Sequence, residues 1–207
     1  MSSAADSVNR VAAVVLAAGG STRMQAGHKL LLPVNGRPMI ATVVDQVLAA
    51  DFRPLVVVTG FNGDAIIQAL EGLPVQGVVN RRWRQGLASS LKAGLQALKP
   101  EVQGALFVLA DMPLVDVKTL VELREQFTKQ GCNAIVYPAH QGRQGNPVLF
   151  PRRFFSEIMA LKGDRGAQGV LRRHAADSIA LPVDSRAVLV DFDTDQDYAD
   201  LRLKNNR

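Results

Sequence analysis

The stretch Val11-Ala-Ala-Val-Val-Leu-Ala17, followed by Ala18-Gly19-Gly20, decides the fold of this chain. An uninterrupted apolar run of this length, rich in valine, is typical of a strand that is buried on both faces of a parallel sheet. A glycine-rich loop directly after such a strand lies where open parallel sheets bind their ligands. We therefore expect an α/β protein whose first strand lies inside the sheet.

The chain continues as an alternation of apolar strands and amphipathic helices. Further strands are expected over residues 55–59, 74–79, 105–110 and 134–137, and helices over 39–48, 64–70, 87–98 and 117–127. Alternation of this kind predicts a three-layer, Rossmann-like α/β fold with a mostly parallel central sheet.

Beyond Pro138 the alternation is less regular. Short strands are expected at 147–150, 179–183 and 187–190, and helices at 153–161, 167–174 and 195–203. No internal repeat or low-complexity block separates these segments from the preceding ones, so we interpret them as additions to the same sheet. Residues 11–207 are expected to form a single domain, and residues 1–10 a flexible N-terminal tail.

Composition narrows the class of protein. With 24 basic and 19 acidic residues, the net charge of the 207-residue chain is +5, which favours anionic ligands. The basic residues are scattered without interleaved aromatic side chains, so no nucleic-acid partner is expected. Cys132 is the single cysteine, which excludes an internal disulfide and suits the cytoplasm. No apolar run approaches the ~20 residues of a membrane span, and no membrane partner is expected.

Two loops at the carboxyl ends of predicted strands carry candidate functional residues. The first, Leu16 to Lys29, matches neither a dinucleotide fingerprint nor a Walker sequence. Its small residues still allow backbone groups to approach a base or a phosphate closely. Arg23 and Lys29 in this loop could reach one polyanion together, and the alternative is a glycine turn with two solvated cations.

The second loop is Leu109-Ala-Asp-Met-Pro113, in which Asp111 directly follows an apolar run. A carboxylate at the carboxyl end of a buried strand is a suitable hard-oxygen ligand for Mg²⁺. The alternative is a turn or helix-capping aspartate. At the same sheet edge as Arg23 and Lys29, Asp111 would complete a triphosphate site.

Residues 16–24, Leu-Ala-Ala-Gly-Gly-Ser-Thr-Arg-Met, resemble the signature loop of nucleotidyltransferases of the molybdenum-cofactor type, within the MobA-like superfamily. The sequence Leu16-Ala-Ala-Gly19 is similar to the molybdopterin cytidylyltransferase subgroup. The resemblance extends from about residue 11 to 201 and implies the fold of nucleotide-diphospho-sugar transferases. Further segments that agree with this family are Asn80-Arg-Arg-Trp83, Gly86-Leu-Ala-Ser-Ser-Leu91, Ala110-Asp-Met-Pro113, Gly145-Asn-Pro147, Gly163-Asp-Arg-Gly-Ala167 and Asp191-Phe-Asp-Thr194.

The resemblance also implies a role for individual residues. The nucleotide would be bound by Leu16, Ala17, Ala18, Gly19, Gly20 and Ser90. Catalysis would depend on Arg23 and Lys29 at the triphosphate and on Asp111 at Mg²⁺. The acceptor would be bound by Gly145, Asn146, Pro147, Gly163 and Asp164. For Asp191 and Asp193 two interpretations remain: further metal ligands, or a turn before the last helix with Thr194 or Asp195 as its N-cap.

The activity implied by the resemblance is Mg²⁺-dependent transfer of CMP from CTP to the terminal phosphate of molybdopterin, with release of pyrophosphate. Such a reaction needs alignment and charge neutralisation rather than a general base, because the acceptor phosphate is already ionised. Alternatives are a guanylyltransferase or a transferase for a sugar or polyol phosphate. An alternative of another class is a carrier that delivers the cofactor to a partner molybdoenzyme.

Overall fold

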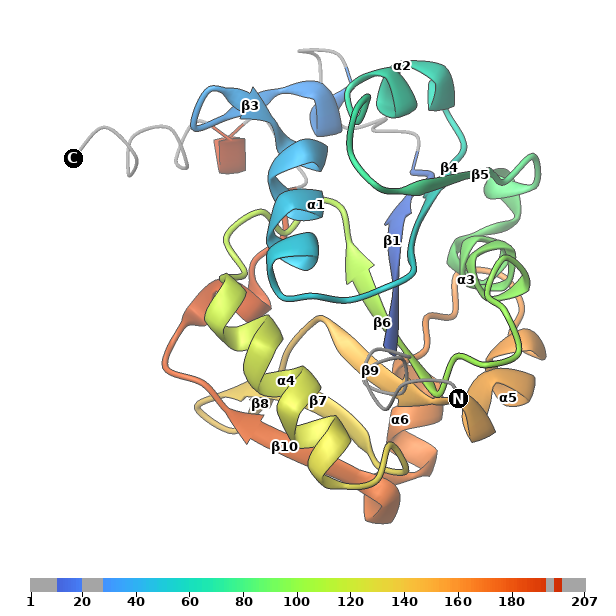
Figure 1. Cartoon of the computed structure of the whole chain (residues 1–207), viewed down its shortest axis with the longest axis vertical. Helices are drawn as coiled ribbons and strands as arrows, with labels where there is room; N and C mark the ends of the chain where they lie inside the picture. Colours follow the sequence, from blue (N-terminus) through green and yellow to red (C-terminus); the bar gives the residue numbers. More distant parts are fainter. Residues whose placement is uncertain (1–10, 20–27, 193–195, 199–207) are drawn as a thin grey trace, which may run out of the picture.

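A single sheet forms the centre of the protein (Figure 1), in a computed structural model that describes residues 11–19, 28–192 and 196–198. Its strand order is β10-β7-β9-β6-β1-β4-β5, with β8 paired to β7. The first half of the chain supplies a parallel block: β1 (Val11–Ala17) lies between β4 (Leu55–Thr59) and β6 (Gly104–Leu109), and β5 (Gln76–Val79) forms the edge beside β4.

The second half of the chain extends the same sheet beyond β6. Strand β9 runs antiparallel to both β6 and β7, whereas β10 is parallel to β7. The expected mostly parallel α/β sheet is therefore confirmed. The added strands are β7 (Ile135–His140), β8 (Arg143–Gln144), β9 (Val148–Pro151) and β10 (Ser178–Pro182).

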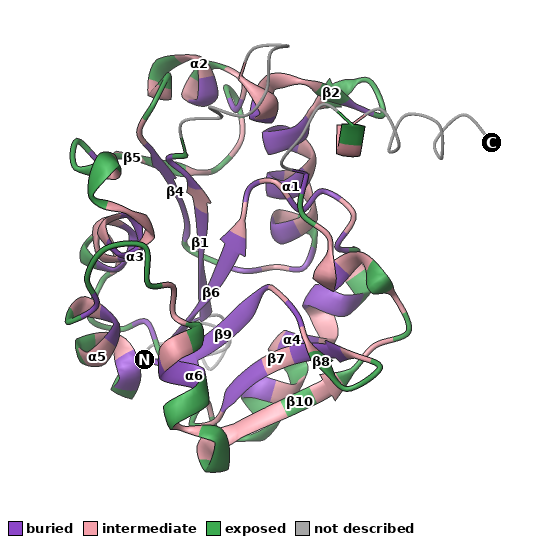
Figure 2. Cartoon of the chain, turned by 180° about the vertical axis from the view of Figure 1, so that it is seen from behind, coloured by how far each residue is buried: buried purple, intermediate pink, exposed green. Residues whose placement is uncertain are grey.

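Helices cover both faces of the sheet, and β1 shows why. Val11, Ala13, Val15 and Ala17 pack into one hydrophobic cluster, whereas Ala12 and Val14 pack into the other. Because successive side chains of a strand point to opposite faces, an uninterrupted apolar run requires cover on both sides. Figure 2 shows the buried residues concentrated on the central strands.

One face is covered by α1 (Met39–Ala49), α2 (Gly63–Gln68) and α4 (Val117–Lys129), and the other by α3 (Leu87–Gln96), α5 (Phe155–Met159) and α6 (Gln168–Arg173). Local signals explain individual helix starts. Asp116 caps α4, since its carboxylate accepts a hydrogen bond from the Thr119 N–H at 2.7 Å. Among the described residues, none of the helices has the length and apolar character required for a membrane span.

Several short elements were not expected from the sequence. A two-stranded hairpin precedes α1, and single 3₁₀ turns connect the larger elements. These elements are β2 (Pro33–Val34), β3 (Arg37–Pro38), η2 (Lys29–Leu31), η3 (Trp83–Gln85), η4 (Arg152–Phe154), η5 (Ala175–Asp177) and η6 (Arg186–Leu189).

The strand expected at 187–190 is wrong, because this segment forms η6. The hydroxyl of Ser185 accepts a hydrogen bond from the Ala187 N–H at 3.2 Å, which starts a turn that apolar composition does not reveal. Of the helix expected at 195–203, only residues 196–198 lie within the described part of the chain, and they are helical. The expected tail, residues 1–10, lies outside the described residues.

Candidate active site

The predicted functional loops meet at one edge of the sheet. Strands β1, β4, β5 and β6 are parallel, so their carboxyl ends lie at the same edge. Strand β9 is antiparallel to β6 and begins at this edge, which places Asn146 and Pro147 near the end of β6. The hydrogen bond from the Ala110 N–H to the Leu16 carbonyl, 3.3 Å long, joins the two predicted loops.

An ion pair between the two loops is the central feature of this edge. The Lys29 Nζ lies 2.7 Å from the Asp111 Oδ2, although 82 residues separate them in the sequence. The side chains are only 12% and 19% exposed, respectively. The structure thus brings two of the three expected catalytic residues together, and the third, Arg23, lies outside the described residues with Gly20.

The chain returns to Asp111 near its C-terminus. The Phe192 N–H donates a hydrogen bond of 3.0 Å to the Asp111 carbonyl, which brings the backbone that follows the exposed residue Asp191 to Asp111. Upstream, the Asn146 N–H donates to the Val188 carbonyl at 2.8 Å. The segment 188–192 therefore connects the start of β9 with the loop that follows β6.

The chemistry of this edge can be compared with that of a binding site for a divalent metal. Asp111 provides a carboxylate at this sheet edge, the backbone beside Asp191 bonds to the Asp111 carbonyl, and Mg²⁺ is commonly held by one or two carboxylates together with substrate phosphates. The donor chemistry therefore fits Mg²⁺. Within residues 11–19, 28–192 and 196–198, no three His, Cys, Asp or Glu side chains converge into a metal cluster. The other expected ligand, Asp193, lies outside the described residues.

A second polar group lies at the end of β5, where the sequence analysis assigned no role. The side chain of Asn80 is only 5% exposed, and its Nδ2 donates to the hydroxyls of Ser89 at 2.8 Å and Ser90 at 3.0 Å. Its N–H donates to the Thr59 carbonyl at 2.7 Å. Asn80 thus holds Ser90, the expected nucleotide-binding residue, within the first turn of α3. A polar residue directly after a strand, the same signal as Asp111, could have revealed it.

Trp83 packs onto Gly60, directly after β4 and beside the Ala18 carbonyl. A Cβ atom on Gly60 would lie 2.7 Å from the Cβ of Trp83 and 2.8 Å from the Ala18 carbonyl oxygen, so glycine is needed for this close approach. The ring of Phe61, which is 45% exposed, contacts Trp83 edge-on at 5.9 Å between ring centroids. Aromatic side chains therefore border the expected nucleotide-binding backbone of Ala18.

His28 continues this aromatic border toward the ion pair. Its ring stacks on Phe61 with centroids 5.8 Å apart, and its Nε2 donates to the Phe61 carbonyl at 3.3 Å. Burial lowers the pKa of His28, the positive charge of Lys29 lowers it further, and the hydrogen bond to Phe61 opposes the shift. His28 is therefore neutral near pH 7 and adds no charge beside Lys29.

The expected acceptor-binding residues lie in two separate places. Gly145 and Asn146 pack beside Val188, next to the Asp111 edge. The carbonyl of Gly163 instead accepts a hydrogen bond of 3.1 Å from the Ala88 N–H, so Gly163 and Asp164 lie at the start of α3. This contact requires glycine at position 86 for two reasons. Gly86 has a φ of 94°, and a Cβ there would lie 2.5 Å from both Gly163 and Asp164.

A mixed, mostly parallel sheet with a lysine–carboxylate pair at its carboxyl edge suits a domain that binds and transfers nucleotides. Sequence comparison is more specific, since residues 13–178 match the MobA-like NTP transferase domain. The chain belongs to this family.

Solved structures agree with this assignment. Rv0371c from Mycobacterium tuberculosis H37Rv superposes with a TM-score of 0.81 at 28% identity, covering 94% of this chain and 98% of that one. The same protein in complex with manganese superposes with a TM-score of 0.74 at 28% identity, covering 92% and 97% of the two chains. A similar protein thus binds a divalent metal.

Two curated relatives differ in how much of their length this chain covers. Nicotine blue oxidoreductase of Paenarthrobacter nicotinovorans is 29% identical over 168 residues, which are 79% of this chain and 82% of that protein. The bifunctional protein GlmU of Agrobacterium fabrum is 35% identical over 160 residues, 75% of this chain. The chain spans only about a third of the length of that GlmU, with 34% covered.

Proposed function

We propose that this protein transfers CMP from CTP to the terminal phosphate of molybdopterin and releases pyrophosphate, with Mg²⁺ as cofactor. The Lys29–Asp111 ion pair carries the proposal, because it places a cation and a carboxylate together at the sheet edge. The backbone of Leu16, Ala17, Ala18 and Gly19 and the hydroxyl of Ser90 would bind the nucleotide. The similarity of Leu16-Ala-Ala-Gly19 to cytidylyltransferases favours CTP.

The reaction requires an oxygen of the acceptor phosphate to bond to the α-phosphorus of CTP. The bond from that phosphorus to the bridging oxygen of the β-phosphate breaks, and pyrophosphate leaves with the electron pair. Lys29, and Arg23 with it, would neutralise negative charge on the phosphates. Bound at Asp111, with Asp191 or Asp193 as a further ligand, Mg²⁺ would neutralise the phosphates as well.

Acceptor binding is assigned to Gly145, Asn146, Pro147, Gly163 and Asp164. Asn146 and Pro147 support this role by their position just before β9, which pairs directly with β6 and begins near the end of β6. A phosphorylated acceptor placed there would approach the α-phosphate from the side opposite the expected nucleotide-binding backbone of β1. Such a placement would give the alignment on which an in-line transfer depends.

The test is pyrophosphate release from each of the four ribonucleoside triphosphates, with Mg²⁺ and molybdopterin. We expect release with CTP alone. Release with GTP instead would assign a guanylyltransferase, and release only with a sugar or polyol phosphate would assign another acceptor. Tight binding of the product without any turnover would favour the carrier. Each of these results would contradict the proposal.

Asp111→Asn tests the metal role. Asparagine preserves the shape of the side chain but removes the negative charge that Mg²⁺ recruits, so turnover is expected to fall by about 10²-fold or more, roughly 2.7 kcal/mol of barrier. Asp116→Asn is the matched control, because Asp116 caps α4 and asparagine caps equally well. Turnover of Asp111→Asn within about threefold of the parent would refute the metal role.

A further inference from the structure

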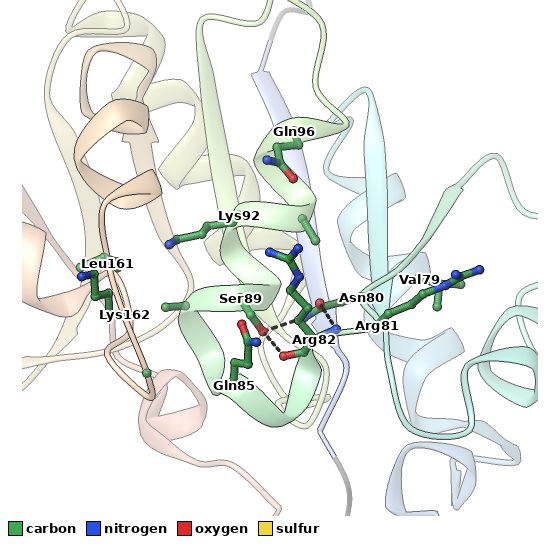
Figure 3. A pocket seen from close by; sticks show the side chains of 13 residues that line it. Val79, Asn80, Arg81, Arg82, Gln85, Ser89, Lys92, Gln96, Leu161 and Lys162 are labelled. Carbon is green, nitrogen blue, oxygen red and sulfur yellow. Dashed lines mark hydrogen bonds between the residues drawn. The ribbon is translucent and has the colours of Figure 1, made fainter.

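A surface cavity of about 560 Å³ lies on the outer side of α3 (Figure 3). Its walls are the outer face of α3, the segment 79–82 after β5 and the segment 161–163 after α5. Among the described residues, Ala18, Gly19, Lys29 and Asp111 do not line it. Asn80 forms the partition between the two regions, since its Nδ2 donates both to Ser89 in the cavity wall and to the buried Ser90.

Positive charge dominates this cavity. Of the residues that the structure describes, its lining contains the basic Arg81, Arg82, Lys92 and Lys162 and no Asp or Glu. In Figure 3, Lys92 extends toward Lys162, and the guanidinium of Arg82 lies against α3, whereas Arg81 points away beside Val79. Three cations therefore share the hollow.

These three cations differ from many basic residues elsewhere on the surface. Several other basic residues are paired within 4.0 Å of a carboxylate, as in Arg37–Asp45, Arg124–Asp51, Arg153–Asp177 and Arg173–Glu157. In the described part of the chain, Arg82, Lys92 and Lys162 have no such carboxylate partner. The carboxylate of Asp164, which follows the cavity segment, is close to Gly86. Like charges gathered in one hollow repel each other, and an anion between them relieves this repulsion.

The remaining lining suits an anion that is rich in oxygen. Gln85 and Gln96 supply neutral amide donors, and Figure 3 shows the amide of Gln85 beside Ser89. The volume lies within the roughly 300–1,000 Å³ of small-molecule sites. Lysine and arginine together, with amide donors between them, are the usual groups that recognise phosphate.

We propose that this cavity binds a small anion with two or more phosphate groups, at a site that contains neither Lys29 nor Asp111. The cations Arg82, Lys92 and Lys162 bind the phosphate oxygens, and Gln85 and Gln96 donate hydrogen bonds. Neither Lys29 nor Asp111 contributes to this site, whereas Gly163, which is assigned to acceptor binding, is one of its lining residues.

Calorimetric titration with inorganic tripolyphosphate tests this site. The reference protein is Lys29→Gln, in which binding at the candidate active site is weakened. In that background the pair Lys92→Gln and Lys162→Gln removes two cavity charges. The matched pair Lys118→Gln and Lys129→Gln removes two charges from α4, where both lysines are exposed.

We expect the cavity pair to weaken tripolyphosphate binding at least tenfold and the α4 pair to weaken it less than twofold. Equal weakening by both pairs would show a general effect of net charge and overturn the proposal. Failure of the Lys29→Gln protein to bind tripolyphosphate at all would overturn it too. With Lys29 intact, the cavity pair is expected to retain the turnover of the parent, which distinguishes loss of this site from loss of the reaction.

Discussion

The Lys29–Asp111 ion pair should couple the two loops energetically, and a double-mutant cycle measures this coupling. The perturbations are Lys29→Met, Asp111→Asn and their combination. At the observed 2.7 Å between Nζ and Oδ2, Coulomb's law gives about 1.5 kcal/mol in bulk water and about 6 kcal/mol at an effective dielectric constant of 20. Desolvation of both groups offsets part of this attraction, and their exposed fractions of 12% and 19% admit some screening. We therefore expect a coupling free energy of about 1–3 kcal/mol.

The assay is urea denaturation of the four proteins at low ionic strength, with the free energy of unfolding extrapolated to water. The exposed pair Lys118–Glu122, 3.8 Å apart and with Lys118 81% exposed, provides the control cycle and should give only about 0.3–0.5 kcal/mol. Raising the salt concentration should reduce the control more, in proportion, than the buried pair. A Lys29–Asp111 coupling no larger than that of Lys118–Glu122 would refute the view that this contact is a specific, partly buried pair.

Three further outcomes follow from packing and protonation. Gly94→Ala should destabilise the protein by about 1–2 kcal/mol in urea denaturation, because the new Cβ would lie 2.3 Å from a methyl group of Val14. This loss should outweigh the higher helix propensity of alanine. The control Gly169→Ala should not destabilise the protein, since a Cβ there would have only the Arg173 side chain nearby, at 3.7 Å. Burial lowers the pKa of His28 in the folded state, so its neutral form is favoured and the melting temperature should fall between pH 7 and 5 more steeply in the parent than in His28→Gln. Burial raises the pKa of Cys132, so its reaction with a thiol reagent at pH 8 should be slower in the folded than in the unfolded protein, and equal rates would contradict this.

Much of the fold could be predicted from local patterns in the sequence. The apolar run at 11–17 becomes β1, and its valines and alanines pack to both faces of the sheet as the absence of alternation predicts. The failures fall where apolar composition is the only signal. Residues 187–190 are rich in β-branched and apolar side chains, yet the Ser185 cap and the turn toward Asp111 form η6 instead.

The candidate site was only partly predictable. Lys29 and Asp111 were expected at one sheet edge because each follows a strand in a parallel block, and the structure places them in contact. Asn80 was missed as a positioning residue, although it too follows a strand directly. The roles of Arg23, Gly20 and Asp193 stay predictions, since these residues lie outside the described part of the chain.

The sequence by itself determined most of the longer strands and helices and which loops carry charged groups, because hydrophobic periodicity and loop chemistry act between near neighbours in the chain. Only the tertiary structure decided that β9 is antiparallel, that the 188–192 segment returns to Asp111, and that three cations of distant segments share one cavity on α3. These features depend on which elements become neighbours in the sheet. That choice is made by the packing of the whole core, and no short stretch of sequence contains it.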